Sequence, residues 1–196
     1  MNALRHVPDD ATNERSQVLL INGSEGDPRT ARMLDQARAL LEAEGAEVDV
    51  LDPALHSASD VYEKWLFTNA VFVIAPGGAH TLPTRYGPAI DRMAQAGYPS
   101  NLAERAYGVV VHGDGADATR RALCGWFDTL GMVDSDSFAT LDRYLGYHEL
   151  DADDIELKDD ADYQAEVGNV AHALSHAVTE LRAGRLSPPE RRLRSV

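Results

Sequence analysis

Apolar and polar positions along the chain form short blocks with two different periods. Short continuous apolar runs bounded by glycine predict strands that are buried on both faces, as in a parallel sheet. Such runs occur at Gln17–Asn22, Ala70–Ala75 and Ala106–His112, and Glu47–Leu51 alternates like a fourth strand. A fifth strand is predicted at Asp136–Leu141.

The segments between these strands carry apolar residues three and four positions apart, which predicts helices. The predicted helices cover Thr30–Gly45, Asp60–Thr68, Thr84–Ala96, Ala116–Leu130 and Ala161–Ala183. Strands that alternate with helices form βαβ units, so the predicted fold class is α/β. The number of elements fits a three-layer sandwich around a five-stranded parallel sheet of order 2-1-3-4-5. A two-layer or barrel arrangement is the alternative.

The 196 residues suffice for one domain, predicted at residues 17–184, between a flexible arm at 1–16 and a flexible basic tail at 185–196. Lys and Arg number 18 against 32 Asp and Glu, so the formal net charge is −14. This acidic balance argues against nucleic acid and anionic membrane as partners. No signal peptide or membrane-spanning run is evident, so a cytoplasmic location is expected. The single cysteine excludes an internal disulfide.

Three glycine-bearing loops follow three of the predicted strands. They are Gly23–Thr30, Pro76–Pro83 and His112–Gly115, after the first, third and fourth strands. The carboxyl ends of parallel strands lie at one edge of a sheet, where ligands of open α/β folds bind at the switch in strand order. The sequence therefore predicts one ligand site built from all three loops.

The first loop has the chemistry of an anion site. It leads from a buried strand into a helix N-terminus, where free N–H groups and the helix dipole attract negative charge. Ser24 and Thr30 add hydroxyl groups, and Arg29 adds a countercharge. We therefore expect these three residues to hold an anionic group.

The same loop also permits a simpler interpretation. Asp27 is a good N-cap and Pro28 suits the first helical position, so the loop could be an ordinary capped turn. Glu25 and Asp27 would repel an anion if their side chains faced it. An anion site therefore requires both carboxylates to turn toward water, and that orientation is expected here.

Three stretches of the chain resemble one enzyme family, in the same order along the sequence. They read LLINGSEGDPRTARML, APGGAHTLPTRYGPAIDRM and VVVHGDGADATRRALCGWFDTLGM. Together they resemble NADPH-dependent FMN reductases and the related flavodoxin-like NAD(P)H:quinone oxidoreductases. The resemblance covers roughly Gln17–Met132, and the residues that match the frame after the third strand are Pro76, Pro83, Ile90, Asp91 and Arg92.

The resemblance implies a flavodoxin-like fold and an FMN site at the carboxyl edge of the sheet. The 5′-phosphate would lie on Ser24, Arg29 and Thr30. The isoalloxazine ring would lie along the second loop, and the third loop would close the other side. The residues implied in these two loops are Pro76, Gly77, Gly78, Ala79, His80, Thr81, His112, Gly113 and Asp114.

The implied function is an FMN-dependent oxidoreductase that takes electrons from NAD(P)H and reduces a quinone, a flavin or a similar small acceptor. A flavin carries the hydride chemistry itself, so no catalytic side chain is assigned. Two alternatives stay open: a flavodoxin-like electron carrier and a flavin-free scaffold of the same fold. Family members commonly form dimers or tetramers, and the helix Thr84–Ala96 is a candidate subunit contact.

Other conspicuous residues are interpreted as structural. Asp91 is expected to cap or pair within the fold, and Cys124 to lie in the core. His172 and His176 are spaced like metal ligands, yet no HExxH glutamate accompanies them, so a surface pair is expected and no metal site. The acidic run Glu149–Asp162 is expected to be solvated and to hold no cofactor.

Overall fold

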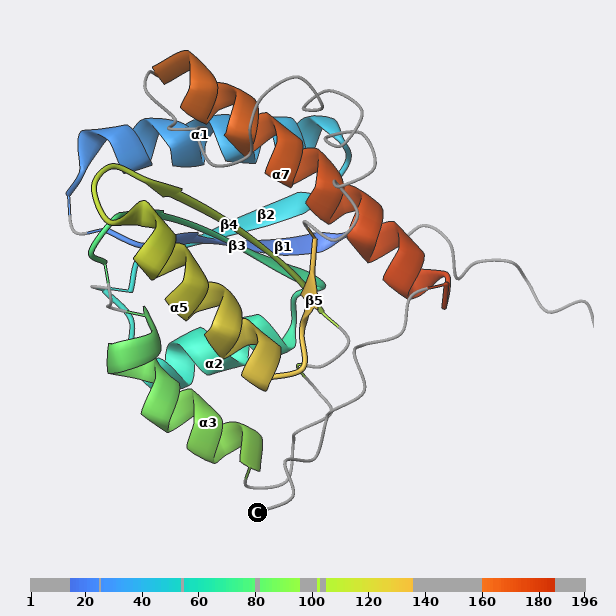
Figure 1. The fold of residues 1–196 in the computed structure, drawn as a ribbon. Helices are drawn as coiled ribbons and strands as arrows, with labels where there is room; N and C mark the ends of the chain where they lie inside the picture. The colour runs from blue at the N-terminus through green and yellow to red at the C-terminus, as the bar shows by residue number, and fades with distance from the viewer. Residues whose placement is uncertain are drawn as a thin grey trace, which may run out of the picture.

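The computed structural model describes residues 15–24, 26–53, 55–79, 82–95, 102, 105–135 and 160–185. Its centre is one five-stranded sheet in which every strand pair is parallel (Figure 1). The strands are β1 (Gln17–Asn22), β2 (Glu47–Leu51), β3 (Ala70–Pro76), β4 (Ala106–His112) and β5 (Val133–Asp134). Their order is β2-β1-β3-β4-β5, which confirms the predicted 2-1-3-4-5 topology.

Helices cover both faces of the sheet, which gives the predicted three-layer sandwich. They are α1 (Pro28–Ala43), α2 (Ala58–Leu66), α3 (Gly87–Gln95), α5 (Ala116–Thr129) and α7 (Asp160–Arg182). Figure 1 shows α1 and α7 above the sheet and α2, α3 and α5 below it. Alternate residues of β1 and β3 enter the two cores, since successive strand side chains point to opposite faces.

Two elements differ from the sequence prediction. The helix predicted at Thr84–Ala96 is a π-helical turn at Leu82–Tyr86 followed by α3. Pro88 has no N–H to donate to the carbonyl four residues earlier, so regular α-helical bonding is interrupted there. The fifth sheet position is taken by Val133–Asp134, directly after the tight turn at Gly131. The strand predicted at Asp136–Leu141 lies outside the described residues.

Candidate functional site

A surface hollow of about 350 Å³ lies at the carboxyl ends of β1, β3 and β4. This is the switch point in strand order, where the sequence predicted a ligand site. The hollow is lined by Asp27, Arg29, Pro76, Gly77, His112, Gly113 and Asp114. All of these except Asp27 belong to the predicted cofactor-binding set. The three predicted loops therefore do converge on one space.

The side chain of Asp27 faces into the start of α1. Its carboxylate accepts the N–H groups of Arg29 and Thr30, each at 3.2 Å, and the Thr30 hydroxyl at 2.8 Å. Asp27 is thus the N-cap of α1, with Pro28 at the first helical position. The expectation that Asp27 turns to water is wrong, because the unpaired helix N–H groups attract the nearest carboxylate. Glu25 lies outside the described residues.

His112 connects this cap to the end of β4. Its side chain is buried, and Nε2 lies 2.8 Å from Thr30 Oγ1 and 3.1 Å from Asp27 Oδ2. Burial disfavours the ionised Asp27 carboxylate, but the bonds from Thr30 and Arg29 outweigh it, so the pKa of Asp27 lies below its ordinary value. Burial also lowers the pKa of His112, with Asp27 opposing the shift and Arg29 adding to it.

This geometry predicts a pH dependence of stability. Because burial keeps His112 neutral in the folded protein, the unfolded chain binds more protons as the pH falls below about 6.5. The free energy of unfolding is therefore expected to decrease from neutral pH toward about pH 5. Urea unfolding at several pH values should show this slope in the wild type and a flatter one in His112→Gln.

The control for this experiment is His172→Gln. The imidazole of His172 is exposed and contacts Glu44 on the surface. This variant measures the effect of losing one surface histidine, and His112→Gln should flatten the pH slope more than this control does. If His112→Gln flattens the slope no more than His172→Gln does, another group is responsible and the role given to His112 is wrong.

Hydrogen bonds hold the loop after β3 against the end of β4 and against α5. Gly77 N–H donates to the His112 carbonyl at 2.7 Å, and Gly78 N–H donates to Thr119 Oγ1 at 2.8 Å. An added Cβ at Gly77 would lie 2.0 Å from the Asp114 carbonyl oxygen. The second loop therefore needs a residue without a side chain at 77 in order to reach the third.

Tyr163 of α7 contacts the site from its other side. Its hydroxyl accepts the Gly113 N–H at 3.1 Å, and its ring meets the His112 ring edge-on at 5.8 Å between centroids. The Arg29 guanidinium lies over the same ring, 5.5 Å from its centroid. Tyr163 was not among the predicted site residues. Its position four residues before Val167 on the buried stripe of α7 is the signal that marks it as inward-facing.

The remaining predicted residues lie beside the hollow or outside the description. The N–H and hydroxyl of Ser24 both donate to Asn22 Oδ1, at 3.0 and 3.1 Å. Thr30 is buried behind Asp27, and Ala79 is half-buried after Gly78. His80 and Thr81 lie outside the described residues.

Asp91 and Cys124, which were expected to have structural roles, both contact other parts of the fold. Asp91 accepts the indole N–H of Trp126 at 3.3 Å. Cys124 packs against the core, and burial raises the pKa of its thiol. Among the described residues, no three His, Cys, Asp or Glu side chains gather as metal ligands. The side chains of the acidic run Glu149–Asp162 lie outside the described residues.

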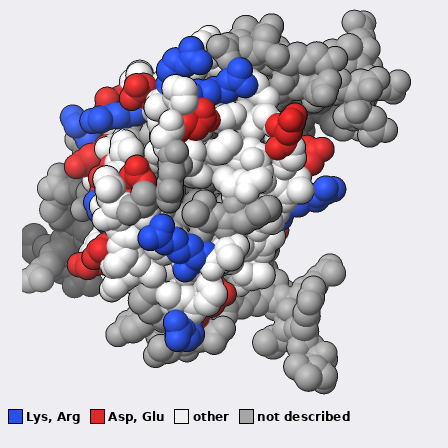
Figure 2. Space-filling model, turned by 90° about the vertical axis from the view of Figure 1, so that its left-hand side faces the viewer, with Lys and Arg blue, Asp and Glu red and all other residues white. Residues whose placement is uncertain are grey.

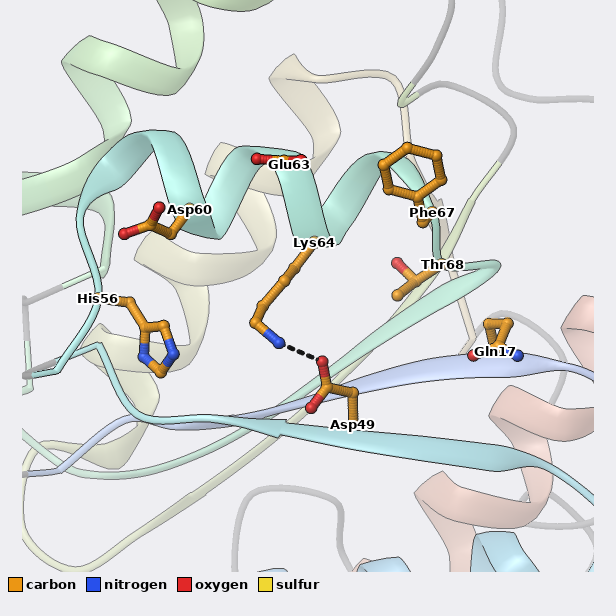
Figure 3. Close-up of a pocket in the computed structure, with 8 residues that line it drawn as sticks. All are labelled: Gln17, Asp49, His56, Asp60, Glu63, Lys64, Phe67 and Thr68. Atoms are coloured by element: carbon orange, nitrogen blue, oxygen red, sulfur yellow. Dashed lines mark hydrogen bonds and ion pairs between the residues drawn. The ribbon is translucent and has the colours of Figure 1, made fainter.

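A second and larger hollow, of about 470 Å³, lies between α2 and the outer strand β2 (Figure 3). It is lined by Gln17, Asp49, His56, Asp60, Glu63, Lys64, Phe67 and Thr68. Several of its polar groups serve the fold: Lys64 pairs with Asp49, and Asp60 closes the capping box with Ser57. None of the predicted cofactor residues line it. We therefore place the candidate site in the smaller hollow, where three strand ends meet.

The face at the carboxyl ends of the strands carries charges of both signs. Figure 2 looks onto this side of the molecule and shows basic and acidic side chains interspersed among uncharged ones. The described part of this face is therefore not uniformly acidic, although the chain has a net charge of −14. A negatively charged small ligand could approach it near the basic groups. Within the described residues, no helix has the length and apolar character needed to cross a membrane.

Comparison with known proteins identifies the architecture. No family model and no curated protein matches the chain. A solved diflavin flavoprotein A3 from Nostoc sp. is 14% identical, with a TM-score of 0.57 over 88% of this chain and 99% of its own. The fold is flavodoxin-like.

Two further solved structures have the same flavodoxin-like fold. A flavodoxin from Streptococcus pneumoniae TIGR4 is 16% identical, with a TM-score of 0.50 over 82% of this chain and 99% of its own. A flavone reductase is 18% identical, with a TM-score of 0.50 over 81% of this chain and 62% of its own. At these identities the likeness is one of fold.

Proposed function

We propose that the chain is an oxidoreductase that binds a flavin in the hollow at the carboxyl ends of β1, β3 and β4. The proposed reductant is NAD(P)H, and the proposed acceptor is a quinone, a flavin or a similar small molecule. One observation carries this proposal: the three predicted loops meet around one hollow at the switch point of a flavodoxin-like sheet. The names of two similar structures, a diflavin flavoprotein and a flavodoxin, support the flavin, and the name of the third, a flavone reductase, supports the redox activity.

The hollow suits the ring end of a flavin. Pro76 and Gly77 line one side, and Gly113 and Asp114 line another. Neither glycine has a side chain, so a planar ligand can lie close against the main chain of both loops, although the two N–H groups already donate to His112 and Tyr163. A bound flavin supplies the redox chemistry itself, so the protein needs only to bind the ring, orient it and limit its contact with water.

The start of α1 does not fit the phosphate of FMN. The N–H groups of Arg29 and Thr30 and the Thr30 hydroxyl are all bonded to Asp27, and Ser24 is bonded to Asn22. A phosphate at this position would meet a carboxylate instead of free donors. In this proposal the protein holds the flavin ring, and no residue is assigned to hold the phosphate of FMN.

The test is a titration of the purified chain, freed of bound ligand, with FMN and with riboflavin. Binding should quench the flavin fluorescence, with saturation at micromolar concentrations. NADH or NADPH should then bleach the visible flavin absorbance, and a quinone should restore it. Glu63→Gln, in the second hollow, is the matched control and should behave as wild type.

Two other results would replace the proposal. Flavin binding with no reduction by either nicotinamide nucleotide would favour an electron carrier. No binding of either flavin would favour a flavin-free scaffold, a function that the inward-facing Asp27 also supports.

A further inference from the structure

The anion position of α1 is already filled from within the chain. A helix N-terminus offers its free N–H groups and positive dipole to one anion, and here that anion is the Asp27 carboxylate. Asp27 Oδ1 accepts one N–H group, and Oδ2 accepts a second N–H and the Thr30 hydroxyl and lies 3.1 Å from His112 Nε2. These contacts come from the loop after β1, the first turn of α1 and the end of β4.

A ligand phosphate bound at the start of α1 would need the same hydrogen-bond donors that Asp27 already uses. A phosphate at this position would displace the carboxylate or lie beside it, and it would carry roughly −1.5 to −2 charges at neutral pH. Displacement would break the bonds of the Asp27 carboxylate to the start of α1 and leave that carboxylate beside the incoming anion. Coexistence would place a second negative charge beside the carboxylate of Asp27, whose side chain is 29% exposed. Either course cancels what the helix N-terminus would otherwise contribute to phosphate binding, and the binding of an uncharged ring is unaffected.

We propose that Asp27 replaces the ligand phosphate, so that this site binds a flavin through its ring and sugar-alcohol chain and gains nothing from a phosphate. Asp27 is then a specificity-determining residue, and FMN and riboflavin are equivalent ligands. This inference rests on the proposed function, in which a flavin occupies the neighbouring hollow.

The experiment compares FMN with riboflavin on wild type and on Asp27→Asn. Asparagine keeps a side-chain oxygen for capping and removes the negative charge. Wild type should bind the two flavins within about threefold of each other. In Asp27→Asn, FMN should bind at least about tenfold tighter than in wild type, the factor that one charge-assisted hydrogen bond provides, while riboflavin changes little. Glu63→Gln removes one charge at a distance and should leave both affinities unchanged.

Two results would overturn this inference. One is a wild type that prefers FMN over riboflavin by more than about tenfold, because the phosphate would then contribute to binding. The other is an Asp27→Asn variant whose preference equals that of wild type. Both results are compatible with a flavin oxidoreductase, so they separate the failure of this inference from the failure of the proposed function.

If neither flavin binds any variant, the proposed function is wrong, and inorganic phosphate still tests the role of Asp27. The backbone amide resonances of Arg29 and Thr30 should shift on phosphate addition in Asp27→Asn and stay in place in wild type. Equal shifts in the two proteins would contradict the inference.

Discussion

Gly77→Ala is expected to destabilise the protein and to abolish ligand binding at the carboxyl edge of the sheet. The new Cβ would lie 2.0 Å from the Asp114 carbonyl oxygen and 2.8 Å from the Ala116 nitrogen, and both are main-chain atoms. The loops after β3 and β4 must then separate, and the bond from Gly77 N–H to the His112 carbonyl is lost. Overpacking of this kind costs about 1–3 kcal/mol of unfolding free energy. Urea unfolding and flavin titration measure the two effects.

The matched control is Gly78→Asn, one residue further along the same loop. Gly78 has a φ of +81°, which asparagine tolerates better than other side chains, and a Cβ there would meet nothing within 4 Å. Its cost should stay below about 1 kcal/mol. A Gly77→Ala protein as stable as Gly78→Asn would show that the close approach of the two loops is unimportant.

Trp65→Ala is expected to lower the free energy of unfolding by about 3–5 kcal/mol, the range for removing a large buried aromatic side chain. Trp65 is fully buried on α2, and its ring packs edge-on against Trp126 and Phe127, with centroids 5.6 Å away in both pairs. The substitution removes the shared centre of the cluster that attaches α2 and α5 to the lower face of the sheet. Chemical denaturation of both proteins measures the difference.

Trp65→Phe separates packing from hydrogen bonding. Among the described residues, Trp65 Nε1 has no hydrogen-bond partner, so phenylalanine removes a buried donor that is unsatisfied. The loss of ring volume and the removal of this donor act in opposite directions, and the net cost should be below about 1.5 kcal/mol. A Trp65→Phe protein as unstable as Trp65→Ala would mean that the indole N–H is essential.

The strands were the most predictable part of the fold. Gln17–Asn22 and Ala106–His112 match β1 and β4 residue for residue, because each is an apolar run too short for a typical helix and is followed by glycine. The order of strands was predicted from the number of alternating strands and helices, which suits the order 2-1-3-4-5. The two-residue β5 was not predictable by the same means, since it is too short to show a period.

The convergence of three loops on one hollow was predictable, and the direction of Asp27 was not. A capped turn and an anion site require the same residues at a helix start, so the sequence of the loop fits both. The difference depends on Thr30 and His112, which are 82 positions apart and meet only in the folded chain. Tyr163 contacts Gly113 from 50 positions later in the chain, and its place on the apolar stripe of α7 predicts that it faces inward but not which residue it meets.

The contacts of Tyr163 also fix when the site can form during synthesis. Tyr163 lies near the start of α7. Its hydroxyl accepts the N–H of Gly113, and its ring contacts the guanidinium of Arg29. β1, β3 and β4 are all made earlier, yet the loops after β1 and β4 lack their common brace until α7 has left the ribosome and docked. A ligand that requires the complete site would therefore bind only after α7 has docked, and a chain that ended before Tyr163 would lack both of these contacts.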